Sequence, residues 1–228
     1  MFEKNLSNPT LTGARGESLI STHTVLRNTY FLLSLTLLWS AGIAWFALKA
    51  NAPYPGFLLT IVGVIGLYFL TYSLRNSAWG VLAIFGFTGF IGYTMGPFLH
   101  AFMHNYANGG SLIVTALGGT GLIFFGLSGY VLTTRKDFSF MRGFLFVGLL
   151  VAIVAMVLGI FVKIPGLQLA ISAALVIIFS GYILYDTSRI INNGERNYLL
   201  ATIALYLDIV NLFQNLLILL GGTSGNRN

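Results

Sequence analysis

Seven long apolar segments alternate with short polar gaps along the chain. They cover residues 28–48, 54–74, 79–99, 111–132, 143–162, 166–186 and 198–220. A helix that crosses a bilayer needs about 20 mostly apolar residues, which is the length of each segment. Lipid offers no water to unpaired backbone N–H and C=O groups, so a spanning segment has to be helical. The pattern predicts an all-α membrane protein, a bundle of seven transmembrane helices.

The polar gaps are too short to fold by themselves. We expect one transmembrane domain over residues 28–221, preceded by a flexible N-terminal tail over 1–27 and followed by a short C-terminal tail over 222–228. The N-terminal tail is too long, and the apolar segment after it too extended, for a signal peptide, so the first helix is expected to be retained. Short connections between the helices predict that sequence neighbours are antiparallel.

Composition agrees with a membrane protein and excludes several other classes. Hydrophobic residues make up 56% of the 228 residues and charged residues 8%, whereas a soluble domain carries about 25% charged residues. The net charge of +6 does not indicate nucleic-acid binding, because the basic residues lie in the gaps between apolar segments. The chain has no cysteine, which excludes disulfides and thiolate sites. Motifs for hydrolysis or phosphate binding do not occur, so we expect neither an enzyme nor a resident cofactor.

The distribution of Lys and Arg predicts the orientation in the membrane. Nine of the twelve lie in the N-terminal tail and in the gaps that follow the second, fourth and sixth segments. The other three are Lys49, Lys163 and Arg227. Because basic loops stay on the cytoplasmic side, we expect a cytoplasmic N-terminus and an outward C-terminus in a bacterial inner membrane.

Two aspartates, Asp186 and Asp208, lie within the apolar segments. An Asp at the centre of a spanning helix costs about 2.5–3.5 kcal/mol, so such a residue is by default functional. The turn between the last two helices places the two residues within about 6 Å in depth, and their carboxyl groups can meet. Such a pair is expected to share a proton and to act as a proton sensor or a cation site. The alternative is that Asp186 pairs with Arg189 and Asp208 only hydrogen-bonds to a neighbouring helix.

Neighbouring residues extend this candidate site. Asn211 and Asn215 lie on the same face of the last helix as Asp208, and this polar stripe predicts that the seventh helix lies in the middle of the bundle. Tyr182 precedes Asp186 by one helical turn and is a candidate hydroxyl partner.

Other residues give weaker indications. Arg75 ends the second segment on the side of Asp186, either as a counter-charge or as an ordinary positively charged residue at the interface. His100 and His104 have the spacing of a metal pair but no acidic neighbour in sequence, which favours an interfacial position. Glycines within 92–96 and 118–121 favour close helix packing over phosphate binding.

Five stretches of the chain resemble a known family. They read VLRNTYFLLSLTLL, FTGFIGYTMGP, VLTTRKDFSF, YILYDTSRII and ALYLDIVNLFQNLL, and they are spread from the first segment to the last. On these residues the chain resembles a bacterial member of the Bax inhibitor-1 family, nearest its YccA-like branch. The resemblance implies a seven-helix bundle with helix 7 central and a pH sensor formed by Asp186 and Asp208.

The resemblance also implies a function. We expect a pH-sensitive leak channel for calcium, with calcium as the permeating or transiently bound ion and Arg75 as the nearest match to an arginine latch that closes on Asp186. The YccA-like branch implies an alternative, a non-transporting modulator that binds a membrane-anchored ATP-dependent protease through its N-terminal tail. A proton-coupled transporter is a third hypothesis, disfavoured because no paired broken helices are evident.

Overall fold

A computed structural model describes residues 9–162, 164–192 and 194–224, with side chains from residue 23 onward. The helices are α1 (Pro9–Lys49), α2 (Phe57–Ser73), α3 (Trp79–Asn105), α4 (Gly109–Thr134), the short 3-10 helix η1 (Ser139–Met141), α5 (Arg142–Phe161), α6 (Leu167–Ile191) and α7 (Tyr198–Thr223). No strand occurs in these residues, and the predicted all-α class is confirmed. Residues 1–8 and 225–228 of the predicted tails lie outside the described part.

Six helices are long and apolar enough to cross a membrane, which makes the chain an integral membrane protein. The exception is α2, whose 17 residues span about 26 Å at 1.5 Å per residue. The hydrocarbon core is about 30 Å thick. The structure thus supports six of the seven predicted spans by length, and α2 falls just short of the core thickness.

Several helices extend beyond their predicted ends. α3 continues to Asn105 through Pro97, and α6 continues to Ile191. The helix α1 begins at Pro9, well ahead of residue 28, while the flexibility of the tail stays a prediction. Hydropathy marks only the part of a helix that lies in hydrocarbon, whereas a helix can continue into the headgroup region with polar side chains. Asp186 therefore lies more than one turn inside α6 and not at its end.

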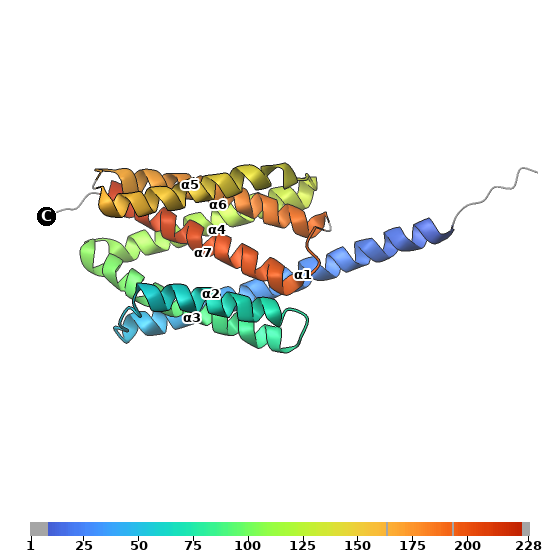
Figure 1. Cartoon of the computed structure of the whole chain (residues 1–228), viewed down its shortest axis with the longest axis horizontal. Helices are drawn as coiled ribbons and strands as arrows, with labels where there is room; N and C mark the ends of the chain where they lie inside the picture. The colour runs from blue at the N-terminus through green and yellow to red at the C-terminus, as the bar shows by residue number, and fades with distance from the viewer. Residues whose placement is uncertain (1–8, 163, 193, 225–228) are drawn as a thin grey trace, which may run out of the picture.

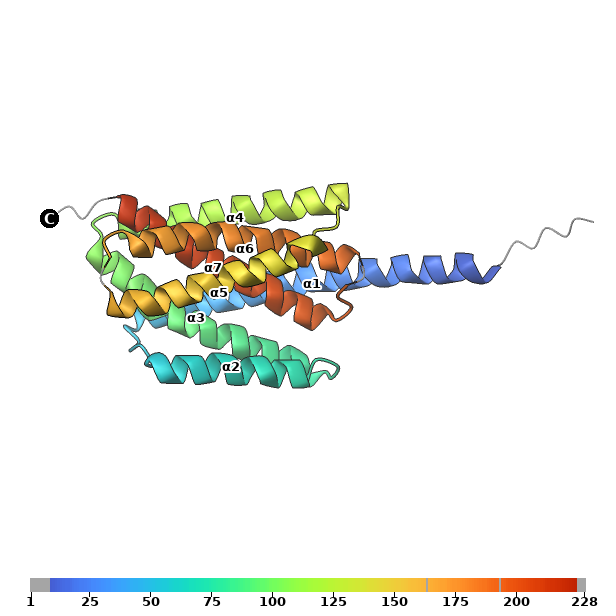
Figure 2. The ribbon, with the colours of Figure 1, turned by 45° about the horizontal axis from the view of Figure 1, so that its top comes forward.

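The helix α7 packs against α1, α3, α4 and α6, and it runs diagonally between them (Figures 1 and 2). The helix α2 packs mainly on α3, and α5 packs mainly on α6. Among the described residues, α7 does not pack to a similar extent against α2 or α5. The expected arrangement, in which six helices surround the seventh, is therefore not confirmed. Half of the most apolar window of α7 is buried, compared with 11% for α5. The helix α7 is thus an interior helix and α5 a peripheral one.

Three loops meet at one end of the bundle. Nδ2 of Asn197, ahead of α7, donates to the backbone oxygen of Arg75 at 2.9 Å. Oγ of Ser188 on α6 accepts from the backbone N–H of Phe138 at 2.9 Å. The N-terminal part of α1 projects beyond the bundle at this same end (Figures 1 and 2). The elements that carry most of the basic residues are therefore gathered at one end, as the charge pattern requires.

Close helix packing depends on only some of the glycines. A Cβ atom at Gly96 would lie 2.5 Å from Cβ of Ala47, and one at Gly92 would overlap the backbone of Ser40. These two glycines let α1 and α3 approach each other, as expected for this spacing. The expectation of close packing in 118–121 holds at Gly119, where a Cβ atom would lie 2.9 Å from Cδ2 of Leu216, and is wrong at Gly118. A Cβ there would meet nothing within 4 Å, because this side of α4 faces away from the bundle.

Candidate functional site

Asp186 on α6 and Asp208 on α7 lie next to each other inside the bundle. Their exposed fractions are 8% and 4%, and both border the same groove. The two side chains are close enough to interact, and a hydrogen bond between two carboxyl groups would require a proton on one of them. Oδ2 of Asp208 has no hydrogen-bond partner among the described residues. A proton or a cation would relieve the repulsion between two carboxylates at this depth.

Arg189 and Glu195 continue the acidic pair toward the loop end of the bundle. Nη1 of Arg189 lies 3.2 Å from Oδ1 of Asp186, and its Nη2 lies 3.2 Å from Oε2 of Glu195. The pairing of Asp186 with Arg189 and the contact of Asp186 with Asp208 therefore exist together, although the sequence presented them as alternatives. Glu195 was not anticipated, because a glutamate in a polar loop gives no sequence signal of an ion-pair partner.

The predicted supporting residues line the same groove. Tyr182 borders it close to both aspartates, although no hydrogen bond from its hydroxyl to either carboxyl group is found in the described part of the chain. Asn211 and Asn215 also face the groove. Their Nδ2 atoms donate to the backbone oxygens of Leu207 and Asn211, both at 2.8 Å. A backbone oxygen can only accept, so the Nδ2 atoms are the donors in these bonds, and each amide keeps its second N–H and its Oδ1 acceptor.

Arg75 is held away from the aspartate pair in this structure. Its guanidinium carbon lies 4.0 Å from the centre of the Tyr72 ring, and Nη1 donates to the backbone oxygen of Tyr72 at 3.2 Å. The arginine that pairs with Asp186 is Arg189 instead. A latch role for Arg75 stays a prediction that requires a different arrangement of α2.

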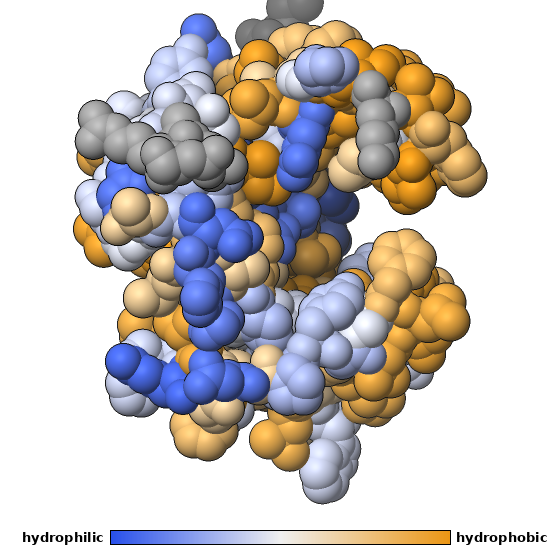
Figure 3. Space-filling view, turned by 90° about the vertical axis from the view of Figure 1, so that its left-hand side faces the viewer, coloured by the Kyte–Doolittle hydropathy of each residue, from blue (hydrophilic) through white to orange (hydrophobic). Residues whose placement is uncertain are grey.

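The groove opens on one side of the molecule. It has a volume of about 700 Å³, with α7 as its floor, α5 and α6 as one wall and Phe98 of α3 on the other side. Seen from the end where the C-terminus lies, the molecule is hollowed on one side, and hydrophilic residues lie deep in the hollow (Figure 3). Polar floor residues are thus reached from the side of the bundle.

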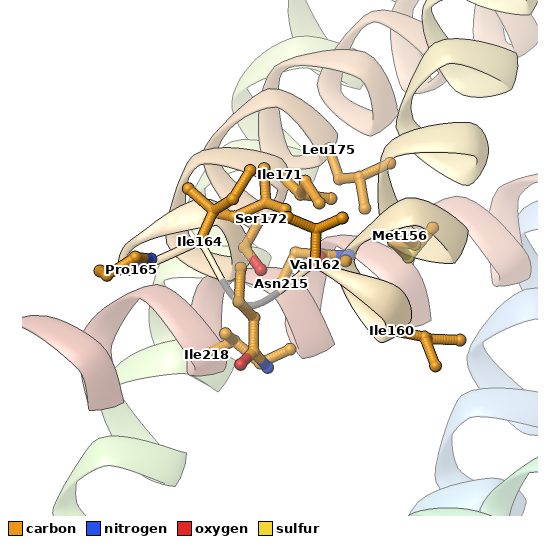
Figure 4. Close-up of a pocket in the computed structure, with 13 residues that line it drawn as sticks. Met156, Ile160, Val162, Ile164, Pro165, Ile171, Ser172, Leu175, Asn215 and Ile218 are labelled. Atoms are coloured by element: carbon orange, nitrogen blue, oxygen red, sulfur yellow. The ribbon is translucent and has the colours of Figure 1, made fainter.

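A second cavity of about 560 Å³ adjoins the groove at the turn between α5 and α6. The two share Met156, Leu175, Asn215 and Ile218. Figure 4 shows Ser172 and Asn215 as polar side chains among apolar neighbours. Together the groove and the cavity extend along α7 from the level of the aspartate pair toward the end of the bundle opposite the loop cluster.

A buried hydroxyl network, which sequence reasoning did not single out, lies on another side of α7. The Tyr206 hydroxyl is 2.6 Å from Oγ of Ser40 and donates to the backbone oxygen of Thr88 at 3.2 Å. Tyr206 is fully buried. The network joins α7 to α1 and α3, and an isolated Tyr in an apolar helix does not reveal it.

The metal-binding capacity of the site is limited. The described residues contain no group of three or more His, Cys, Asp or Glu side chains that could hold a metal ion. Ca²⁺ takes six to eight oxygen ligands, of which the groove offers two carboxylates and several amide oxygens. These residues fit a passing cation better than a resident one. His100 and His104, with ring centres 5.7 Å apart on α3, lie beside a separate hollow near Lys49.

A family model described as inhibitor of apoptosis-promoting Bax1 matches residues 22–225. The chain is 52% identical over 207 residues to the modulator of FtsH protease YccA of Escherichia coli K12, covering 91% of this chain and 94% of that protein. A protein named inner membrane protein YccA, from Escherichia coli O6:H1, matches with the same identity and coverage. An uncharacterized protein of Pseudomonas aeruginosa is 52% identical over 202 residues, covering 89% of this chain and 90% of its own length. The chain belongs to the Bax inhibitor-1 family, in its YccA-like branch.

Proposed function

We propose that this protein modulates a membrane-anchored ATP-dependent protease of the FtsH type in a bacterial inner membrane. The observation that carries the proposal is the 52% identity to the named modulator over 91% of the chain. The match also covers 94% of that protein's own length, so it extends over nearly the whole of both chains. In this proposal the N-terminus is cytoplasmic and the C-terminus lies outside.

The shape of α1 supports a contact through the N-terminal segment. The helix runs for 41 residues from Pro9 to Lys49, about 60 Å at 1.5 Å per residue. This is about twice the thickness of the hydrocarbon core, so part of the helix lies beyond it. It projects on the side of the clustered loops (Figure 2), where a cytoplasmic partner would reach it. The aspartate pair lies inside the bundle and is not needed for this contact.

Reconstitution with the protease tests the proposal. Liposomes would contain the FtsH-type protease, a membrane-bound substrate and either the full chain, a variant lacking residues 1–22, or a control in which residues 1–22 are scrambled at the same length. We expect the full chain to slow substrate degradation and both variants to lose this effect while retaining their thermal stability in detergent. A full chain that leaves degradation unchanged would contradict the modulator role, and equally active variants would exclude the N-terminal contact.

A second candidate function, a proton-controlled leak for calcium, is favoured by the buried contact between Asp186 and Asp208 at the groove floor. In this proposal loss of the shared proton separates α6 and α7 by repulsion, and protonation closes them. Helix α7 acts as the centre around which the other helices rearrange. Calcium is the permeating ion and not a resident cofactor.

Calcium flux into dye-loaded liposomes between about pH 6 and about pH 8 tests the leak. Asp186→Asn and Asp208→Asn keep the shape of each side chain but cannot ionise, so each is expected to flatten the pH dependence. The double variant should add little, because coupled residues act as one unit. Asp137→Asn, in an exposed loop, is the matched control. A wild-type pH midpoint in Asp186→Asn would count against a shared proton.

A further inference from the structure

The groove along α7 combines a polar floor with apolar walls. Its floor carries Asp208, Asn211, Gln214 and Asn215. Its walls are formed by apolar side chains of α3, α5 and α6, which include Phe98, Leu149, Ile153, Met156, Leu175 and Phe179. Such a pairing of surfaces is typical of a site for a small amphipathic ligand.

The floor accepts more hydrogen bonds than it donates. One N–H of each side-chain amide is used, by the backbone of α7 for Asn211 and Asn215 and by the sulfur of Met95, at 3.4 Å, for Gln214. One N–H of each amide remains, against two lone pairs on each amide oxygen and the acceptor-only carboxylate of Asp208. Oδ2 of Asp208, on a side chain only 4% exposed, has no partner in the part of the chain that the structure describes. A buried acceptor without a donor is costly. The groove therefore favours a ligand that brings N–H donors and a positive charge.

The charges around the groove agree with a cationic ligand. Asp186 and Asp208 border it, together with the hydroxyl of Tyr182. Arg189 is ion-paired with both Asp186 and Glu195 and is not among the residues that line the groove. One guanidinium thus pairs with two carboxyl groups, and Asp208 has no basic partner among the described residues.

The groove is open toward the lipid. The helix α5 packs on α6, and α2 packs on α3, with no comparable packing between α2 and α5 in the described ranges. On this side the molecule is hollowed between two apolar groups of side chains (Figure 3). An apolar molecule dissolved in the membrane would enter the groove sideways without crossing a polar surface.

We infer that the groove is a binding site for amphipathic primary amines. The ammonium group donates to the carboxyl group of Asp208 and to the amide oxygens of Asn211 and Asn215, and the alkyl chain lies against the apolar wall formed by α5 and α6. A primary ammonium supplies three donors and one positive charge, which matches the floor. The inference goes beyond protease modulation and calcium leakage and requires neither.

Other ligand classes match the groove less well. Asp208 lies ten residues, about 15 Å, along α7 from Tyr198, so a phospholipid that reached it would bring its negatively charged phosphate to this depth beside the two carboxyl groups. A fatty acid would place a third carboxylate beside the aspartate pair. A metal ion would lack ligands on the apolar walls.

Photo-labelling tests the inference. The protein would be placed in phosphatidylcholine nanodiscs and exposed to a dodecylamine that carries a diazirine in its alkyl chain, with the alcohol and the carboxylic acid of the same length as comparison probes. We expect the amine to label peptides of α5, α6 and α7, unlabelled dodecylamine to compete, and the comparison probes to label only lipid-facing surfaces. Labelling of these peptides by all three probes alike would show membrane partitioning and overturn the inference.

Matched variants sharpen the test. Asp208→Asn should weaken the competition by unlabelled amine about tenfold, the size expected for one charge-assisted hydrogen bond. Ile153→Trp, at a wall residue, should fill the groove and block labelling. Val151, on the same helix, is 62% exposed and does not line the groove, so Val151→Trp should not block labelling. Ile153→Trp keeps the inference falsifiable if Asp208→Asn fails to fold. Labelling unaffected by Ile153→Trp would place the amine elsewhere, and because neither protease nor calcium is present, that result would leave both proposed functions untouched.

Discussion

The contact between α1 and α3 gives a prediction whose size follows from the structure. Gly96 lies where α3 crosses α1, and a Cβ atom there would be 2.5 Å from Cβ of Ala47 and 2.9 Å from the backbone nitrogen of Leu48. Non-bonded carbon atoms prefer about 3.5–4.0 Å. Gly96→Ala therefore forces the two helices apart locally by about 1 Å, and backbone atoms on α1 cannot move aside as a flexible side chain would.

The expected energy combines two opposing effects. Overpacking of this kind costs about 1–3 kcal/mol, while replacing a helical glycine with alanine favours the folded state by about 0.5–1 kcal/mol. Gly86 lies on the same helix, and a Cβ there meets nothing within 4 Å. Gly86→Ala should therefore show the favourable effect alone. The difference between the two variants, about 1–3 kcal/mol, isolates the steric clash.

Unfolding in mixed micelles with increasing dodecyl sulfate would measure both variants against the wild type. Gly96→Ala should lower the midpoint and Gly86→Ala should leave it unchanged or raise it. In thermal unfolding the difference corresponds to about 2–4 °C for each kcal/mol at this chain length. Equal midpoints for the two variants would refute the assignment of Gly96 to a tight helix crossing.

Three further predictions concern polar contacts. Asn197→Ala removes the acceptor for two backbone N–H groups at the start of α7, and the same unfolding titration should show a loss of about 1–2 kcal/mol. Tyr206→Phe removes the hydroxyl that donates to the backbone oxygen of Thr88 and bonds with Ser40, and should cost about 1–3 kcal/mol. Unchanged stability would contradict a stabilising role of this network. The backbone N–H of Ser139 bonds to the Asp137 carboxylate and keeps its pKa below the ordinary value of 3.8. This stabilisation is present above that value and lost as the pH falls through the lowered pKa. Hydrogen exchange of the 137–140 loop should therefore accelerate below about pH 4 in the wild type but not in Asp137→Asn. A rate that stays constant in both proteins would contradict the prediction.

Tertiary contacts explain what sequence reasoning about the site could and could not find. Asp186 and Asp208 stand out in the sequence because an acidic residue in an apolar helix is costly, and helix geometry alone places them at similar depth. Glu195 does not stand out, because its contact with Arg189 depends on how the loop between α6 and α7 folds back. Arg75 has the right position in sequence, but the structure stacks it on Tyr72.

The sequence by itself determined the class of the protein, the number of helices and their approximate limits. Backbone groups in lipid have to be paired within the helix, so seven apolar segments can form little else. The tertiary structure decided which face of each helix is buried. Lipid is as apolar as a helix interface, so hydropathy does not distinguish Gly96, packed on α1, from Gly118, which faces away from the bundle. The groove along α7 depends likewise on α5 and α2 packing on different partners, which is settled by the fit of all the helices together and by no single segment.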